Sequence, residues 1–364
     1  MRILFAGGGT GGHLYPGIAI ARALVKLDPN IVPVFVGAKR GIDREVLPRA
    51  GFKHLLLDLH PLYRDKPWEN WRTIVGGLSA WREVSKLASG ARPKVVVGTG
   101  GYAAGVALAW ATLNRVPIVQ HAGDSYPGIT ARWFAKYTRE MYLGFPEAER
   151  FLSHKRATFL ATGNPIDPPP EPRPDRAKAR ELWGFPPDGG KVLLFYGGSQ
   201  GSVAMNKVME DWIVSGLPDD LYIIWGTGTK NYPQHKKLES ARVKVRGYLS
   251  PIADAYAAAD FALARAGAMT TSELCAWGLP QILVPLPSAA ADHQTYNAVA
   301  LQKAGAAIHI PQRQFTLTTL DKTVTDLLDK PARLESLSAG ARSRAKPAAA
   351  DQIARRILAL ARAR

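Results

Sequence analysis

Cysteine is nearly absent from this 364-residue chain, and long apolar stretches are absent altogether. The single cysteine, Cys275, excludes a disulfide-stabilised scaffold and is typical of a protein from a reducing cytosol. No uninterrupted run of about 18 apolar residues exists, so we expect no membrane-spanning helix. The N-terminus leads directly into an apolar strand, so we expect no signal peptide.

Acidic residues are also scarce, since 30 Asp and Glu face 47 Lys and Arg and leave a net charge of +17. Such a charge implies an anionic partner, which can be nucleic acid, an acidic membrane surface or a phosphorylated substrate. A merely solvated basic surface is the alternative. The chain has no zinc pattern and no RNA-binding motif, so we expect no nucleic acid. It has no Asp-x-Asp pair and its histidines are scattered, so we predict no metal site and no cofactor.

The length favours two domains, and the order of elements predicts what they are. Apolar strands alternate with helices, which indicates parallel sheets with ligands at the carboxyl ends of the strands. A strand followed by a glycine-rich turn at residues 3–12 recurs at residues 192–202, after the proline-rich segment 168–174. We therefore predict an α/β fold of two Rossmann-like, doubly wound domains facing a cleft, with the boundary at residues 162–163.

The first glycine-rich turn, residues 7–12, precedes a helix whose N-terminus suits a phosphate group. His13, at the mouth of the turn, can take a proton from a bound group. Gly7, Gly9 and Gly12 also satisfy the dinucleotide pattern G-x-G-x-x-G. That interpretation is disfavoured because the next strand ends without a carboxylate, although Arg40 could serve an NADP phosphate. A turn without any ligand is the remaining alternative.

The second half carries a better nucleotide site. Its glycine-rich turn, residues 197–201, offers backbone N–H groups and the Ser199 hydroxyl to a diphosphate. Glu273 can accept both hydroxyls of a ribose, or it can merely cap the helix that we place at residues 270–277. Residues 292–295 open a further helix with four polar groups that can bind a sugar, and N-capping by Asp292 is the alternative.

Four segments together resemble the MurG family of peptidoglycan glycosyltransferases. They are residues 7–16, residues 197–201 with Asn206, residues 265–280, and residues 285–297. That family transfers N-acetylglucosamine from UDP-GlcNAc to lipid I to give lipid II, with inversion and without a metal required for its fold. The resemblance implies a GT-B architecture with an N-terminal acceptor and membrane domain, residues 1–162, and a C-terminal UDP-GlcNAc domain, residues 163–344. It also implies that a final helix, residues 345–364, packs back on the first domain.

The resemblance implies the roles of individual residues. The donor would be held by Ser199, Gln200, Asn206, Leu249, Ala268, Met269, Thr270, Glu273, His293 and Gln294. The acceptor and reacting centre would face Thr10, Gly11, Gly12, Gly100, Gly101, Tyr102, His121 and Asp124, with His13 as the catalytic base. Two positions depart from the family. The family has His-Glu-Gln-Asn where this chain has residues 121–124, His-Ala-Gly-Asp, and an arginine where this chain has Asp167.

The helix predicted at residues 67–87 carries an apolar stripe edged with cations. The stripe and its flanking cations are Trp68, Trp71, Ile74, Val75, Leu78 and Trp81, with Arg64, Lys66, Arg72, Arg82 and Lys86. A buried core face is one explanation. Tryptophans edged with cations also describe a helix lying on anionic lipid, and we favour this interpretation. It predicts a peripheral protein on the cytoplasmic face of the inner membrane.

Three other functions remain open. A transferase acting on a different lipid shares the fold and the membrane face. A UDP-GlcNAc 2-epimerase also uses two such domains, but it needs acid and base carboxylates that these motifs do not show. A non-catalytic protein would bind the UDP-sugar without turnover, and the departures at Ala122, Asp124 and Asp167 are the features that favour it.

Overall fold

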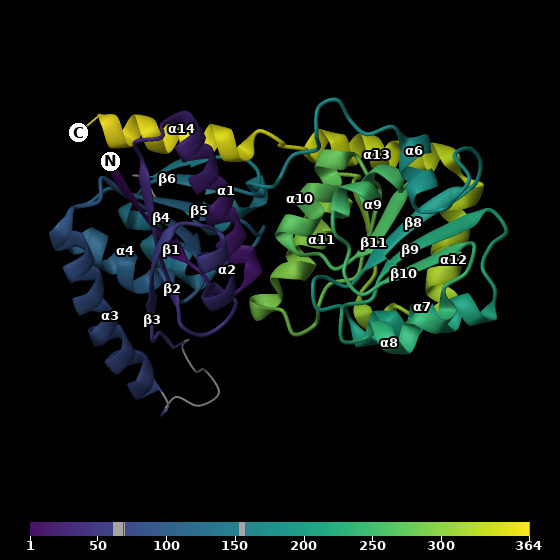
Figure 1. The fold of residues 1–364 in the computed structure, drawn as a ribbon, viewed down its shortest axis with the longest axis horizontal. Helices are drawn as coiled ribbons and strands as arrows, with labels where there is room; N and C mark the ends of the chain where they lie inside the picture. The colour runs from purple at the N-terminus through teal and green to yellow at the C-terminus, as the bar shows by residue number, and fades with distance from the viewer. Residues whose placement is uncertain (61–67, 69, 153–156, 364) are drawn as a thin grey trace. The chain divides into compact units, whose positions relative to one another are not determined.

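The computed structural model describes residues 1–60, 68, 70–152 and 157–363, without the side chains of residues 70, 72 and 74. The chain divides into two compact units, one made of Met1–Asp167 and Pro347–Arg364 and the other of Pro168–Lys346 (Figure 1). The chain thus passes between units at residues 167–168 and 346–347, whereas the sequence analysis placed these points at 162–163 and 344–345.

Unit 1 contains a parallel sheet of seven strands in the order β3-β2-β1-β4-β5-β6-β7. The strands are β1 Arg2–Gly7, β2 Val32–Ala38, β3 Lys53–Leu57, β4 Val95–Gly100, β5 Ile118–Ala122, β6 Thr138–Leu143 and β7 Thr158–Leu160. The helices are α1 Gly11–Leu27, α2 Asp43–Arg49, α3 Asn70–Gly90, α4 Ala104–Leu113, α5 Ile129–Phe134 and α14 Ala349–Arg362. Because β1 pairs with β2 on one side and β4 on the other, the turn that follows it lies at the carboxyl edge of the sheet between these two strands.

Helices cover both faces of this sheet, which explains why its strands are apolar throughout. Successive side chains of a strand point to opposite faces, so Ile3 and Phe5 of β1 join one core with α1 and α14. Leu4 and Ala6 join the other core with α3 and α4.

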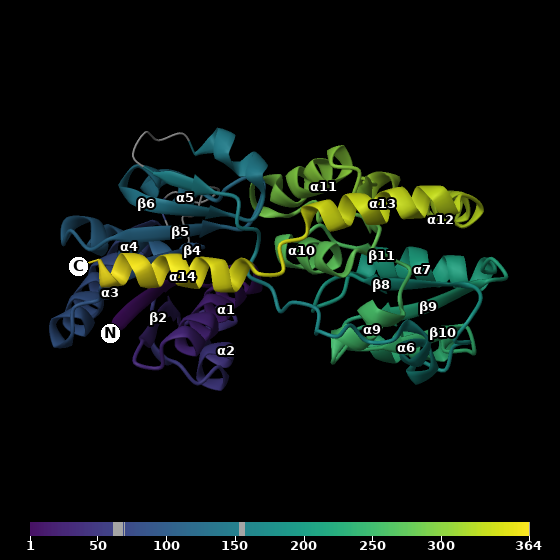
Figure 2. The same cartoon turned by 90° about the horizontal axis from the view of Figure 1, so that it is seen from above.

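The last helix, α14, is part of unit 1 and lies beside α1 (Figure 2). Its apolar stripe includes Ile353 and Ile357, which are fully buried. On β6 the Glu140 carboxylate accepts two hydrogen bonds from Arg356, 2.8 Å from Nε and 2.5 Å from Nη2. The hydroxyl of Tyr142 donates a third, at 2.9 Å. These contacts attach the end of the chain to the sheet of the unit in which the chain begins.

Unit 2 contains a parallel sheet of six strands in the order β10-β9-β8-β11-β12-β13. The strands are β8 Lys191–Tyr196, β9 Leu221–Gly226, β10 Val243–Arg246, β11 Phe261–Ala264, β12 Gln281–Leu283 and β13 Ala307–His309. The helices are α6 Arg176–Leu182, α7 Val203–Ser215, α8 Tyr232–His235, α9 Ile252–Ala258, α10 Ala268–Trp277, α11 His293–Lys303, α12 Leu317–Asp329 and α13 Pro331–Arg344. The two parallel-sheet α/β units confirm the predicted fold class.

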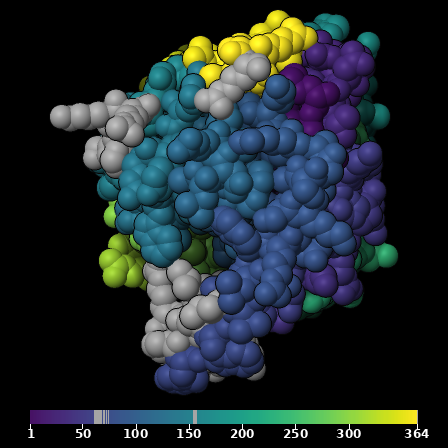
Figure 3. All heavy atoms as spheres, turned by 90° about the vertical axis from the view of Figure 1, so that its left-hand side faces the viewer, coloured from purple at the N-terminus to yellow at the C-terminus, as the bar shows by residue number. Residues whose placement is uncertain are grey.

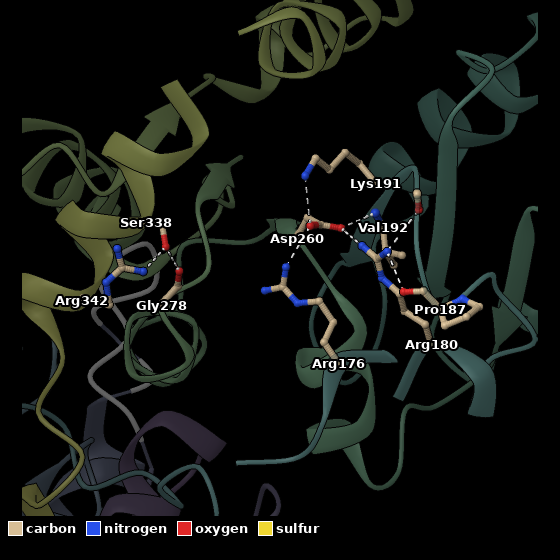
Figure 4. Close-up of polar contacts among 10 residues, drawn as sticks. Arg176, Arg180, Pro187, Lys191, Val192, Asp260, Gly278, Ser338 and Arg342 are labelled. Carbon is tan, nitrogen blue, oxygen red and sulfur yellow. Dashed lines mark hydrogen bonds and ion pairs between the residues drawn. The ribbon is translucent and has the colours of Figure 1, made fainter. Parts of the chain in front are cut away.

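Polar contacts fix unit 2 at the amino ends of its strands and at the end of α10 (Figure 4). Asp260, just before β11, accepts hydrogen bonds from Arg180 of α6 at 2.6 Å and from Val192 N of β8 at 2.8 Å. The Ser338 hydroxyl of α13 donates to the Gly278 carbonyl that ends α10, at 2.6 Å. These bonds anchor one edge of the sheet and leave the carboxyl edge to the glycine-rich turns.

The described part of the chain lacks two features. None of its helices combines the length and the apolar character needed to cross a bilayer. None of its groups of His, Cys, Asp and Glu side chains is arranged to hold a metal ion.

Candidate functional site

The glycine-rich turns after β1 and β4 touch each other at the carboxyl edge of the unit 1 sheet. Gly9 (φ 85°) and Gly101 (φ 78°) adopt left-handed conformations that favour glycine. A Cβ on Gly101 would run into the carbonyl of Gly8, and one on Gly9 would lie 2.8 Å from the ring of Tyr102. Gly101 therefore permits the close approach of the two backbones, and Gly9 permits the close approach of the Tyr102 ring.

His13 lies in the first turn of α1, between these two loops. Its Nδ1 lies 3.0 Å from the Thr10 hydroxyl, so the hydroxyl binds the imidazole and does not cap the helix. A Cβ on Gly100 would lie 2.7 Å from Cδ2 of His13, so the ring packs directly against that glycine. The structure thus brings together Thr10, His13, Gly100, Gly101 and Tyr102, five of the residues assigned to the acceptor side.

A buried carboxylate supports the first loop, and the sequence analysis did not identify it. Asp43, at the start of α2, is fully buried and accepts hydrogen bonds from Gly9 N at 2.9 Å and Ala38 N at 2.8 Å. Burial raises the pKa of Asp43 above its ordinary value, although the two backbone bonds and the charge of a protonated His13 oppose this. The signal in the sequence is an acidic residue shortly after the second strand, but a carboxylate was expected only at the tip of that strand.

His121, at the end of β5, is buried, and its surroundings keep it neutral. Burial lowers its pKa to about 4, and the neighbouring Asn164 side chain acts weakly in the opposite direction. A protonated His13 lowers the pKa of His121 further, so the two rings lie within electrostatic range. A group with this pKa is a poor base at neutral pH, which leaves His13 as the better candidate.

The departures from the family occupy different environments. Ala122 is buried in an apolar cluster with Met141 and Leu143, so its neighbours suit a small apolar side chain. Asp124 is half-buried, and Asp167, the last residue of unit 1 before the linker, is exposed.

In unit 2 the turn after β8 presents Ser199 and Gln200 to solvent at the carboxyl edge of the sheet. The turn packs against the loop after β9. A Cβ on Gly201 (φ 75°) would clash with the carbonyl of Thr227, and a Cβ on Gly228 would clash with the carbonyl of Gln200. Exposed polar groups on a tightly held backbone suit a diphosphate.

Asn206 does not fit a direct role in donor binding. It is fully buried, its Nδ2 donates to the Thr227 carbonyl at 2.8 Å, and its Oδ1 accepts from Trp225 Nε1 at 3.2 Å. Both ends of the side-chain amide therefore bind the protein itself. This corrects the prediction, because Asn206 holds the loops after β8 and β9 in place.

Glu273 lies in the second turn of α10, since this helix begins at Ala268 and not at residue 270. The capping alternative is therefore wrong. The Tyr256 hydroxyl donates to Oε2 of Glu273 at 2.8 Å and lies 3.0 Å from the Tyr196 hydroxyl. Burial raises the pKa of both tyrosines, so both stay protonated and can orient the carboxylate. No pattern in the sequence indicates this chain of hydroxyl groups.

The other predicted donor residues surround the same edge. Ala268, Met269 and Thr270 form the half-buried first turn of α10, which has no side-chain cap. Leu249 is buried near Gly226.

The start of α11 is not capped by Asp292, so that alternative is also wrong. The Asp292 carboxylate accepts from the Thr295 hydroxyl at 2.7 Å. His293 Nδ1 lies 2.9 Å from the Ala290 carbonyl, and Gln294 Oε1 accepts from Leu286 N at 3.0 Å. Both predicted sugar-binding side chains are half-buried at this helix start.

Helix α3 lies on the surface of unit 1 (Figures 1 and 3). This helix and Trp68, just ahead of it in the chain, present large apolar side chains to solvent. Trp68 is 71% exposed, Trp71 60%, Val75 57% and Leu78 64%. The helix packs through another face that includes Ala80 and Val84, so a core explanation fails for these four residues.

The remaining residues of the predicted stripe differ. Trp81 is half-buried against the core, which corrects its assignment to the exposed stripe. Arg82 and Lys86 are exposed. Arg64 and Lys66 lie outside the described residues, and so do the side chains of Arg72 and Ile74.

Known proteins match both units. Residues 3–143 match the glycosyltransferase family 28 N-terminal domain, and residues 192–353 match the family 28 C-terminal domain. In solved structures, MurG from Acinetobacter baumannii has the same fold, with a TM-score of 0.79 at 24% identity over 98% of this chain and 99% of that one.

Two relatives carry the name UDP-N-acetylglucosamine–N-acetylmuramyl-(pentapeptide) pyrophosphoryl-undecaprenol N-acetylglucosamine transferase. The protein of Porphyromonas gingivalis is 36% identical over 97% of this chain and 94% of its own length. The protein of Salinibacter ruber is 38% identical over 99% of this chain and 96% of its own length. From these matches over nearly the whole chain, together with the family 28 domains in both units, we conclude that the chain belongs to the MurG family of glycosyltransferases.

Proposed function

We propose that this protein transfers N-acetylglucosamine from UDP-GlcNAc to lipid I, giving lipid II for peptidoglycan synthesis. The observation that carries the proposal is the pair of glycine-rich turns in unit 1 with His13 packed between them. The activity is the one named for the relatives, whose sequences match almost the full chain.

In the proposed donor site, unit 2 binds UDP-GlcNAc. The diphosphate lies on the turn of Ser199 and Gln200, near the uncapped start of α10. The ribose hydroxyls bind the Glu273 carboxylate, which Tyr256 orients. The sugar lies against His293 and Gln294. No residue of this set requires a metal ion or another cofactor.

In the proposed reaction, His13 acts as the base. In the proposed tautomer Nδ1 carries the ring proton and donates it to the Thr10 hydroxyl, so the lone pair on Nε2 accepts the proton of the acceptor hydroxyl. The acceptor oxygen attacks the anomeric carbon, the bond to the diphosphate oxygen breaks, and UDP leaves with the electron pair. Backbone N–H groups of the second glycine-rich turn stabilise the negative charge on UDP.

The acceptor is a lipid, so we further propose that α3 docks on the anionic cytoplasmic surface of the inner membrane. The exposed Trp71 of α3 and Trp68 just ahead of it suit the headgroup region, and Arg82 and Lys86 suit anionic lipid. A vesicle sedimentation assay with Leu78→Gln tests this. We expect weaker binding to vesicles containing anionic lipid. The matched control Leu182→Gln changes another exposed leucine, in unit 2, and should bind as the wild type does. Equal binding of both variants would refute the docking role of α3.

The decisive experiment is transfer of labelled GlcNAc from UDP-GlcNAc to a short-chain lipid I analogue, with UDP release measured in parallel. We expect labelled product and stoichiometric UDP. Binding of UDP-GlcNAc without product would point to another lipid acceptor or to a non-catalytic homologue. Conversion of UDP-GlcNAc without any acceptor would indicate the epimerase.

His13→Ala separates catalysis from binding. We expect turnover to fall by about two to four orders of magnitude, the usual contribution of a general base, while UDP-GlcNAc affinity is retained. A variant that loses donor affinity to the same extent would remove His13 from the role of base.

A further inference from the structure

A buried cation lies beside the proposed diphosphate loop, and its surroundings hold no opposite charge. Arg265, directly after β11, is 8% exposed. Its Nη1 donates to the carbonyls of Val284 and Pro285, at 3.0 and 2.9 Å. Its Nη2 donates to the Ser202 hydroxyl at 2.8 Å and to Gln312 Oε1 at 2.6 Å.

All four acceptors are neutral. In the described part of the chain, no ion pair joins Arg265 to a carboxylate. Burial is the single cause that lowers its pKa, to about 10, so the guanidinium stays charged at neutral pH. A buried charge without a counter-ion is costly, and proteins retain such a charge mainly where it serves a function.

Two helix starts add positive charge near Arg265. Ser202, which Arg265 contacts, is the N-cap of α7, and α10 begins three residues after Arg265. Neither helix has an acidic residue in its first turn. The N-terminal end of a helix carries a partial positive charge, so three positive features lie around this edge of unit 2.

We propose that Arg265 is a positioning residue for the diphosphate of a nucleoside-diphosphate sugar. It holds Ser202, which ends the glycine-rich turn, and its buried charge is balanced when the diphosphate binds on that turn. This inference rests on the proposed donor site. It does not require Arg265 to touch the ligand, because a charge acts through the poorly polarisable interior over several ångströms.

The competing explanation is structural: Arg265 only joins three segments by hydrogen bonds. The two explanations differ in which ligand loses affinity. A structural defect weakens the binding of uridine and UDP alike, whereas loss of the charge weakens UDP and spares uridine. The ratio of the two affinities is therefore the informative quantity.

The experiment measures the binding of UDP and uridine by calorimetry to the wild-type chain, Arg265→Met and Arg265→Lys. We expect Arg265→Met to lose about 10- to 100-fold in UDP affinity, the usual effect of losing a charge-assisted interaction, with uridine changed less than about twofold. Arg265→Lys keeps the charge and should restore most of the UDP-to-uridine ratio. The control Arg242→Met removes another arginine of unit 2 that donates to two backbone carbonyls, Pro218 and Asp219, and should leave the ratio unchanged.

If Arg265→Met does not fold, Ser202→Ala provides the second variant, because it removes the contact between Arg265 and the turn. We expect it to lower UDP affinity several-fold and to leave uridine affinity unchanged. An unchanged UDP-to-uridine ratio in the variants that fold would overturn the inference while leaving the donor site intact. Failure of the wild-type chain to bind UDP would instead overturn the proposed function.

Discussion

The pair Glu140–Arg356 gives the sharpest test of how unit 1 is assembled. Glu140 is buried on β6, and Arg356 comes from α14 at the far end of the sequence. Removing one partner of a fully buried ion pair costs about 3–5 kcal/mol, and an exposed pair contributes about 0.2–1 kcal/mol. The Arg356 side chain is 44% exposed while Glu140 is buried, so this pair lies between the two limits. We therefore expect Arg356→Ala to lower the free energy of unfolding by about 1.5–3 kcal/mol.

The pH dependence of this loss provides a second check. Burial alone would raise the pKa of Glu140, but hydrogen bonds from Arg356 and Tyr142 outweigh it, so the pKa is lowered from its ordinary value of 4.5. A carboxyl with a lowered folded-state pKa stabilises the fold above its ordinary pKa, and this contribution is lost as the pH falls through the lowered value. Without Arg356 the burial effect remains and the pKa rises, so the cost of Arg356→Ala should be greatest at neutral pH and smaller in acid.

Urea unfolding of the wild-type chain and Arg356→Ala between pH 3.5 and 7.5 measures both effects. The control is Arg355→Ala, which removes the neighbouring exposed arginine of the same helix. If Arg356→Ala destabilised unit 1 no more than Arg355→Ala does, or if its cost grew in acid, the assignment of this pair as an anchor of α14 would be refuted.

Three further predictions concern the two sites. Asp43→Ala leaves the backbone N–H groups of Gly9 and Ala38 without their acceptor, so we expect kcat to fall at least about tenfold while UDP affinity is retained. The transfer assay and calorimetry measure these two quantities, and a loss of UDP affinity would contradict the prediction. Tyr256→Phe removes the hydrogen bond to Glu273, so we expect the affinity for uridine to fall about 3- to 10-fold and the affinity for 2′-deoxyuridine to fall less. An equal loss of affinity for both nucleosides would argue against ribose binding at Glu273. Gly201→Ala places a side chain at φ 75° against the carbonyl of Thr227. We therefore expect thermal unfolding to show a loss of at least about 1 kcal/mol in stability, and we expect UDP affinity to fall. A variant with wild-type stability and affinity would show that the turn is not constrained.

Local patterns predicted most of the fold. Apolar runs followed by glycine-rich turns predicted the order of strands and helices, because parallel strands buried on both faces must be apolar throughout. The glycines of residues 7–12 and 197–201 predicted the two loops because their conformations exclude other residues. The exact starts of helices were harder to predict from the sequence. An error of two residues at the start of α10 left a capping role open for Glu273.

The supporting parts of the site could not be predicted, because they depend on contacts between distant segments. The position of Asp43 after the second strand is visible in the sequence, but its contact with the turn at Gly9 appears only in the fold. Tyr256 reaches Glu273 only after α9 and α10 have packed. Asn206 was assigned to the ligand because it belongs to a motif, and its burial shows that a motif residue can serve the loop itself.

The discontinuity of unit 1 has a consequence for its synthesis. Translation proceeds from the N-terminus, so the ribosome completes all of Pro168–Lys346 before it makes α14. Until then the apolar face that α14 covers, which includes Ile18 and Ala21 of α1, has no partner, although unit 2 is already whole. The nascent chain therefore exposes an aggregation-prone surface for as long as unit 2 takes to emerge, and a stop codon before Ile353 would make that exposure permanent.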